Sequence, residues 1–143
     1  MLDRLRSIAL LVGRIGIGVI FFVHGWQKFT TMGLGGVTAF FDSLGIPLAG
    51  VAAPAVAVLE VVGGIALILG AGLPVFGSLL VLNMIGAIVF VHGANGFAVD
   101  KGGYEFVLAL AAATLAIAFS GGGALAVDSL WQRRSAPVPV SAA

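Results

Sequence analysis

Four long apolar runs constrain this chain more than any other feature of its sequence. They cover residues 8–29, 51–69, 74–93 and 104–119. A helix of about twenty apolar residues crosses the hydrocarbon core of a bilayer. Between the second and third runs, Gly70 to Pro74 combines two glycines with a proline, which predicts a helix stop and an immediate restart. We therefore predict an all-α membrane protein, a four-transmembrane-helix bundle formed by residues 1–131.

The composition supports a membrane protein and excludes other classes. Hydrophobic residues make up 60% of the chain and charged residues only 9%, whereas about a quarter of the residues in a soluble domain are charged. The chain has no cysteine, which excludes a disulfide framework and any thiolate metal site. Its net charge of +1 comes from dispersed residues, so we expect the lipid bilayer, and no nucleic acid, as a partner.

Basic residues predict the orientation of the bundle. Arg4 and Arg6 precede the first run, and Arg133 and Arg134 follow the fourth. An even number of spans places both termini on one side, and the positive-inside rule makes that side cytoplasmic. Arg14 interrupts the first run, which argues against a cleaved signal peptide. Residues 132–143 are small and proline-containing, and we expect a disordered cytoplasmic tail there.

Two shorter segments have helical patterns outside the four runs. Gly36 to Leu44 has apolar residues at helical spacing and predicts a short helix in the outer interface, with Phe40 and Phe41 turned inward. An apolar loop resting on the bundle is the alternative. Residues 124–132 predict a second interfacial helix, with Trp131 at the level of the lipid headgroups.

The two histidines lie in a repeated motif. Phe22-Val23-His24-Gly25 returns 68 positions later as Phe90-Val91-His92-Gly93, within a stretch that has eight identities in thirteen positions. Matching the two histidines of the chain by chance is harder than matching its many glycines and valines. The match predicts a two-helix internal repeat, whose halves are related by an axis along the membrane normal.

Three polar residues lie near the middle of apolar runs. They are Arg14, Glu60 and Asn83, one in each of the first three runs. A charge at the centre of a bilayer costs about 2.5–3.5 kcal/mol even on mild scales. We therefore predict a buried Arg14–Glu60 ion pair, with Asn83 completing its hydrogen bonds. A structural lock is the favoured role, because a proton or substrate relay needs more titratable groups than one acid and one base.

A second polar layer lies nearer the predicted outer side. His24 and Lys28 are one helical turn apart and share a face, and His92 lies at a similar height because the first and third spans run in the same direction. The candidate ligand-binding residues of this layer are His24, Lys28, His92, Tyr104, Glu105 and Trp26.

Several functions fit this outer layer. An interfacial belt is one, because Trp, Tyr, His and Lys favour headgroup depth. A pocket for an amphipathic molecule such as a quinone is another, since these side chains donate hydrogen bonds and stack on rings. A metal ion held by His24, His92 and Glu105 is a weaker alternative. So is a haem held by both histidines, because the sequence does not establish that these side chains face one another.

Several separate motifs resemble one known family. They are Arg14, Gly18, Phe22, His24-Gly25 and Lys28, then Glu60-x-x-Gly63-Gly64 with Leu69-Gly70, then His92 with Asn95-Gly96-Phe97, and Gly103-Tyr104-Glu105. Over residues 8–128 the chain resembles the DoxX family of small bacterial integral membrane proteins. The resemblance implies a multi-pass, four-helix protein of the bacterial plasma membrane. The family takes its name from a subunit of a terminal quinol oxidase related to thiosulfate:quinone oxidoreductase, and its members are associated with redox proteins.

The sequence and the resemblance together lead to two main functional hypotheses. The favoured one is a membrane subunit or scaffold that holds a redox-protein partner, because the chain has no cysteine and no cofactor motif and is not expected to be an enzyme on its own. The alternative is a quinone-binding electron-transfer component that uses the outer layer. A small transporter built on Arg14 and Glu60 is a third hypothesis. Homo-oligomerisation and a role as an oxidoreductase subunit stay open.

Overall fold

All regular secondary structure in residues 1–123 and 125–134, the part of the chain described by this computed structural model, is helical. This confirms the all-α prediction. The α-helices are α1 (Leu2–Thr30), α2 (Gly33–Ser43), α3 (Ala49–Leu69), α4 (Leu73–Ala87), α5 (Glu105–Ser120) and α6 (Val127–Arg134). A π-helical turn, η1 (Ile88–His92), and a 3₁₀ turn, η2 (Gly93–Asn95), continue α4, and a second 3₁₀ turn, η3 (Val99–Lys101), precedes α5.

Within the described residues, three helical segments are long and apolar enough to cross a membrane. They are Leu2–Thr30, Ala49–Leu69 and the continuous run Leu73–Asn95. Helix α5 is equally apolar but has 16 residues. This corresponds to about 24 Å of helix, somewhat less than the roughly 30 Å of a hydrocarbon core. The chain is therefore a membrane protein with three long apolar helices and one shorter one.

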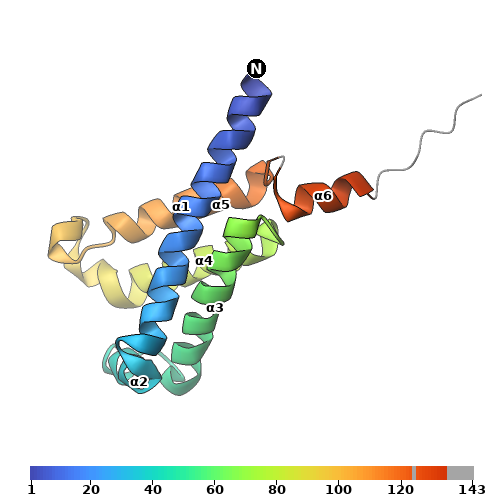
Figure 1. The fold of residues 1–143 in the computed structure, drawn as a ribbon. Coiled ribbons are helices and arrows are strands. Elements are labelled where there is room, and N and C mark those ends of the chain that lie inside the picture. The colour runs from blue at the N-terminus through green and yellow to red at the C-terminus, as the bar shows by residue number, and fades with distance from the viewer. Residues whose placement is uncertain (124, 135–143) are drawn as a thin grey trace, which may run out of the picture.

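The turn between α3 and α4 gives the bundle a defined end. Gly70 ends α3 and Gly72 precedes α4, and both have a positive φ, of 69° and 59°. Glycine adopts this left-handed conformation without steric cost, so the helices reverse within a few residues. The predicted stop and restart is confirmed. We call this end of the bundle the turn end, and the opposite end, which carries α2, the α2 end (Figure 1).

Helix α1 is longer than the sequence pattern predicts. It begins at Leu2 instead of residue 8 and has 29 residues, or about 43 Å of helix. Its N-terminal part extends beyond the other helices at the turn end (Figure 1). Because α1 extends past the turn end, each of its residues lies nearer that end than it would if α1 began there at residue 8.

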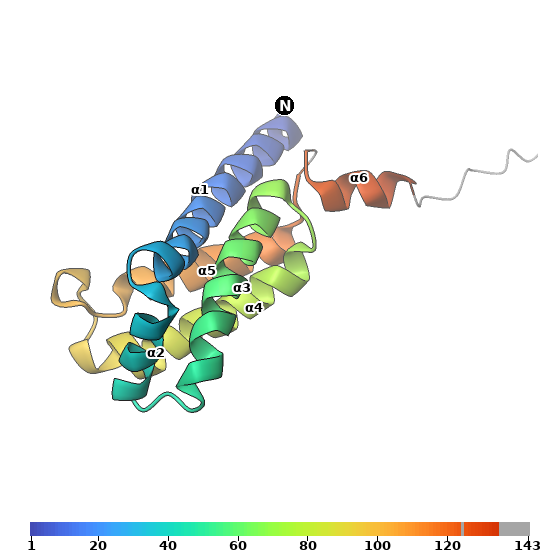
Figure 2. The ribbon, with the colours of Figure 1, turned by 60° about the horizontal axis from the view of Figure 1, so that its bottom comes forward.

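Small residues set the register between α1 and α3. A Cβ atom on Gly18 would lie 2.7 Å from the Gly64 carbonyl oxygen, and a Cβ on Gly64 would lie 2.7 Å from the Gly18 oxygen. Nearer the α2 end, a Cβ on Gly25 would lie 2.8 Å from the Cβ of Glu60. Only glycine allows the two backbones to approach so closely. The two helices are antiparallel and pack along much of their length (Figure 2).

The second close helix pair is α4 with α5. A Cβ on Gly77 would lie 2.5 Å from the Cβ of Ala118, near the turn end. The apolar core joins the two pairs and includes Phe21, Leu67, Leu73, Leu80, Met84, Val107, Leu110, Ala111 and Ile117. Helix α3 meets α4 where Gly63 packs against the Leu80 side chain.

The two short helices follow the predictions in part. Helix α2 spans Gly33–Ser43 and buries Phe41, whereas Phe40, also predicted to turn inward, faces the interior only in part and is 40% exposed. Helix α6 runs from Val127 to Arg134 and leads away from the bundle at the turn end (Figures 1 and 2). It includes the first three residues of the predicted disordered tail. Residue 124 and residues 135–143 lie outside the described part of the chain, and the interfacial position of α6 stays a prediction.

Candidate ligand-binding site

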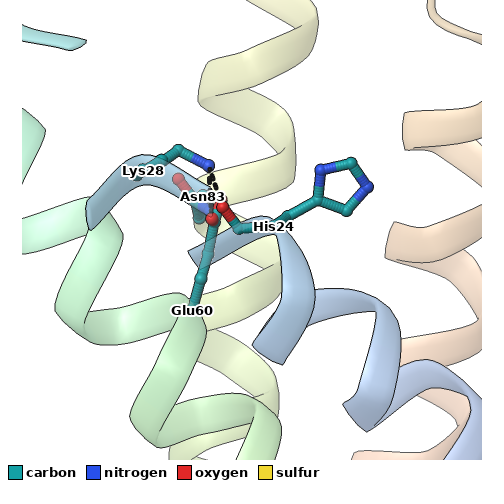
Figure 3. A network of polar contacts seen from close by, with 4 residues as sticks. All are labelled: His24, Lys28, Glu60 and Asn83. Carbon is teal, nitrogen blue, oxygen red and sulfur yellow. Dashed lines mark hydrogen bonds and ion pairs between the residues drawn. The ribbon is translucent and has the colours of Figure 1, made fainter. Parts of the chain in front are cut away.

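A buried carboxylate near the middle of α3 joins this helix to the C-terminal end of α1 and to α4. Glu60 of α3 is only 4% exposed. Its Oε2 forms an ion pair with the ammonium of Lys28 on α1, and its Oε1 accepts a hydrogen bond of 3.0 Å from Nδ2 of Asn83 on α4 (Figure 3). Both carboxylate oxygens therefore have a partner, which compensates the cost of burying the charge. Lys28 and Asn83 each keep further N–H groups beyond those that they donate to Glu60.

The predicted Arg14–Glu60 ion pair is wrong, because the cation that meets Glu60 is Lys28. The register of α1 against α3 explains the error. Gly25 lies opposite Glu60, and Arg14 precedes Gly25 by eleven residues, or about 16 Å of helix. Arg14 lies instead beside the end of α3, where its Nη1 donates to the Ile68 carbonyl oxygen at 3.5 Å. The predicted contact between Asn83 and Glu60 is confirmed.

Arg14 belongs to a second polar cluster, at the turn end. Its side chain is 1% exposed and packs against Gly70, where a Cβ would collide with the guanidinium. The acid whose charge acts on Arg14 is Asp128. The Asp128 carboxylate also accepts the backbone N–H groups of Gly72, at 2.8 Å, and Leu73, at 3.0 Å, which caps the start of α4.

The sequence reasoning missed the structural role of Asp128. A signal for it is present, because Glu60 and Asp128 are separated by the same 68 positions as the two histidines. Glu60 forms an ion pair with Lys28 of α1, whereas Asp128 acts on Arg14 of α1 through its charge and forms no ion pair with it among the described residues. Helix α1 therefore carries two cations that serve opposite ends of the bundle.

A cavity of about 480 Å³ opens beside the Glu60 network. Lys28, Glu60 and Asn83 form its polar part, and apolar side chains from α1, α2, α3, α4, η1 and α5 form most of the remaining wall. The aromatic lining residues are Phe21, Phe40, Phe41, Phe90 and Phe106, together with His24 and His92. A cavity of this size, mostly apolar with a few convergent polar groups, is typical of a small-molecule site.

Half of the predicted ligand-binding set lines this cavity. His24, Lys28 and His92 belong to the wall, whereas Trp26, Tyr104 and Glu105 do not. The Trp26 ring stacks on Phe22, with 6.1 Å between ring centroids. Tyr104 packs edge-on against Phe97 at 5.5 Å, and Glu105 accepts the Val99 backbone N–H at 3.1 Å.

These three residues therefore shape the surroundings of the cavity. Trp26 lies on an exposed face of α1. Tyr104 and Glu105 hold the loop between η2 and α5, part of which forms the cavity wall. None of the three side chains lines the cavity.

The two repeated histidines have different surroundings. The first motif lies in regular α-helix, whereas His92 ends the π-helical turn η1. His92 Nδ1 lies 2.8 Å from the Gly102 carbonyl oxygen, which also accepts Nδ2 of Asn95 at 3.2 Å. A carbonyl oxygen only accepts, so Nδ1 carries the proton and Nε2 of the neutral ring is a hydrogen-bond acceptor. Single π-helical turns recur at functional sites.

The His24 ring points away from the Glu60 network and toward α5 (Figure 3). There it lies tilted against Phe106, with 6.5 Å between the ring centroids. Within residues 1–123 and 125–134, no three side chains of His, Cys, Asp or Glu lie close enough to hold a metal ion. His24, His92 and Glu105 therefore do not form the metal site considered as an alternative.

The polar groups in the cavity wall determine which hydrogen bonds a ligand could form there. Lys28 and Asn83 supply hydrogen-bond donors, and Nε2 of His92 supplies an acceptor. Aromatic and aliphatic side chains surround them. Such a site suits a small molecule that has oxygen atoms on an otherwise apolar body.

The sequence is similar to one family model and to two named proteins. The model of the DoxX family matches residues 9–93. "Putative oxidoreductase CatD" of Bacillus subtilis (strain 168) is 36% identical over 122 residues, which cover 85% of this chain and 86% of that protein. "Inner membrane protein YphA" of Escherichia coli (strain K12) is 30% identical over 128 residues, which cover 86% and 90% of the two chains. No solved structure matches.

Proposed function

This chain belongs to the DoxX family, and from that premise we propose that it binds a quinone-like molecule in its cavity as a multi-pass subunit of a bacterial plasma-membrane redox system. The observation that carries the proposal is the cavity of about 480 Å³ with Lys28, Glu60 and Asn83 at its polar part. The scaffold hypothesis requires no such cavity, so the ligand-binding hypothesis now explains more of the molecule.

In this proposal α5 is the fourth span and both termini are cytoplasmic. Helix α5 is apolar throughout, and a bilayer adapts to a short span by local thinning at modest cost. The arginines that flank the spans, Arg4 and Arg6 before the apolar part of α1 and Arg133 and Arg134 at the end of α6, support this orientation. The turn end then faces the cytoplasm, and the α2 end faces outward.

The chemistry of a quinone fits the wall of the cavity. A ring carbonyl oxygen would accept a hydrogen bond from the Lys28 ammonium or from the Asn83 amide. These groups are strong donors in a site from which most water is excluded. The ring and the hydrocarbon tail would pack against Phe21, Phe90 and Phe106.

A redox partner follows from the relatives and from the chemistry of the site. The relative CatD carries the name of an oxidoreductase. In this proposal the chain presents the quinone, and a partner protein exchanges electrons with it. The close packing of α1 on α3 gives the site a rigid frame for that task.

The two lysines of the chain supply a matched test. Lys28 lines the cavity, whereas Lys101 is an exposed residue of η3 outside its lining. Binding of decylubiquinone to the purified protein in mild detergent is measured by isothermal titration calorimetry. We expect Lys28→Met to weaken binding at least tenfold, about 1.4 kcal/mol, and Lys101→Met to leave it unchanged.

A second variant distinguishes weaker binding of decylubiquinone from loss of the folded structure. Lys28→Met leaves the Glu60 carboxylate buried without a cation, so the double variant Lys28→Met/Glu60→Gln removes the charge pair as a unit. Weak binding by this folded double variant supports the proposal. Wild-type protein that does not bind decylubiquinone, or a folded double variant that binds as tightly as wild type, contradicts it.

A further inference from the structure

Helices α1 and α5 contact each other at the turn end and again, through aromatic side chains, nearer the α2 end. At the turn end, a Cβ on Gly13 would lie 3.8 Å from Cδ1 of Ile117, an ordinary contact distance. Nη2 of Arg6 also donates to the Ser120 carbonyl oxygen at 3.3 Å. Near the α2 end, the contact across the two helices is between the His24 and Phe106 rings, 6.5 Å apart. Backbone and small-residue contacts thus join the two helices at the turn end, whereas two aromatic rings span the space between them nearer the α2 end.

The cavity extends to the aromatic side chains between α1 and α5, and several of its lining residues reach the surface. Phe90 of η1 and Phe106 of α5 both line the cavity, yet each is 41% exposed. His24 also lines the cavity and is exposed. A side chain that contacts both the cavity and the molecular surface marks an opening. Met32, Phe40 and Val99 do so beside α2 and η3, and His24 and Phe106 do so between α1 and α5. This surface belongs to the apolar helices, so the opening faces lipid.

We infer that the cavity opens sideways into the bilayer through a portal between α1 and α5, flanked by His24 and Phe106. This inference rests on the proposed function and adds the route and the class of ligand. The ligand is a lipid-dissolved amphipathic molecule with a hydrocarbon tail. It enters with its polar ring first, because the charged groups lie in the interior and the aromatic groups lie at the opening.

The position of the polar groups supports this direction of entry. Lys28 and Glu60 are largely buried, with side-chain exposures of 18% and 6%. A polar ring gains hydrogen bonds only by travelling from the portal to this interior end. Its tail then stays beside His24 and Phe106, where it continues into the hydrocarbon of the bilayer. A ligand with a hydrocarbon tail therefore enters the portal from the bilayer, whereas a small water-soluble ring reaches the protein from the aqueous phase.

A reversible cross-link tests the portal directly. The chain contains no cysteine, so the double variant His24→Cys/Phe106→Cys carries two thiols and no others. A short bis-methanethiosulfonate reagent joins them and a reductant releases them. The association rate of decylubiquinone is measured with the protein in lipid nanodiscs before cross-linking, after it and after reduction. We expect cross-linking to slow association at least tenfold and reduction to restore the rate.

The control places the same cross-link where the helices already touch. Gly13→Cys/Ile117→Cys joins α1 to α5 at the turn end and should leave the association rate unchanged. A second pair of variants needs no cross-linker: Phe106→Ala should speed association, and Phe106→Trp should slow it severalfold. The Phe106→Ala and Phe106→Trp variants test the portal if the His24→Cys/Phe106→Cys variant does not bind decylubiquinone before cross-linking.

The outcomes separate the portal from the proposed function. Unchanged association after cross-linking His24→Cys/Phe106→Cys, with binding intact, overturns the portal and leaves the binding site standing. Equal slowing by the control cross-link also overturns it, because the effect then comes from general stiffening. Wild-type protein that binds no decylubiquinone overturns the proposed function, and the portal with it.

Discussion

The ammonium of Lys28 lies against the carboxylate of Glu60, and this ion pair forms, with Asn83, the polar part of a largely apolar cavity. The pair joins α1 to α3, and Asn83 extends it to α4. A charge pair at this depth contributes to stability only while both partners are present. The same two side chains therefore link the register of the helices to the chemistry of the cavity.

Removing one member of the pair should cost far more than removing both. We expect Lys28→Met or Glu60→Gln alone to lower the free energy of unfolding by about 3–5 kcal/mol, because an isolated charge or an unpaired donor stays buried. The double variant should lose clearly less than the sum of the two. Equilibrium unfolding in mixed detergent micelles measures all three, and additive losses would contradict the coupling. Lys101→Met, on the surface, should change stability by no more than about 0.5 kcal/mol.

Two neighbouring glycines of α1 should respond oppositely to the same substitution. Gly18→Ala places a Cβ 2.7 Å from the Gly64 carbonyl oxygen. It should destabilise the protein by about 1–3 kcal/mol, because α1 and α3 must move apart. A Cβ on Gly16 would meet no atom of the described residues within 4 Å, so Gly16→Ala should be neutral or stabilising by up to about 1 kcal/mol through helix propensity. Thermal unfolding of both variants checks this; similar losses at the two sites would refute the close helix contact.

Asp128 should matter more than its position near the end of the chain suggests. Asp128→Ala removes the cap on Gly72 and Leu73 and the acid that acts on Arg14. We expect a loss of about 1–2 kcal/mol from the cap alone, with a smaller loss for Asp128→Asn, which keeps one acceptor oxygen. The exposed Asp100 is the matched control, and Asp100→Ala should have little effect on the melting temperature. An Asp128→Ala variant as stable as wild type would contradict the role of the cap.

The two histidines of the repeat should differ in their effect on the loop before α5. His92→Phe removes the hydrogen bond from Nδ1 to the Gly102 carbonyl, whereas His24 has no part in that contact. Hydrogen–deuterium exchange of residues 93–104 should therefore rise severalfold in His92→Phe and stay unchanged in His24→Phe. Equal exchange in both variants would show that Asn95 and Glu105 hold the loop without His92.

The local features of this fold are readable from its sequence. The apolar runs, the stop at Gly70 and the short helix containing Phe41 depend on hydropathy and on neighbouring residues, and each agrees with the structure. Phe40 and Phe41 both line the cavity, but only Phe41 is buried. Adjacent positions on a helix point about 100° apart, and a short pattern does not say which of the two is covered more completely.

The set of residues that line the cavity could not be predicted from any single apolar run of the sequence. We predicted one layer for His24, Trp26, Tyr104 and Glu105 from their positions along the apolar runs. Such positions do not determine the direction in which a side chain points around its helix. Tyr104 and Glu105 lie in the loop before α5 and at its first turn, and Trp26 lies on an exposed face.

The sequence by itself determined that this chain is a helical membrane protein, where its helices break, and which polar residues must find partners. Tertiary structure alone decided that Glu60 meets Lys28 and that Arg14 lies near Asp128. The physical reason is register. Glycine contacts at Gly18, Gly64 and Gly25 set how far α1 slides along α3, and a shift of a few turns exchanges one cation for another at the same acid.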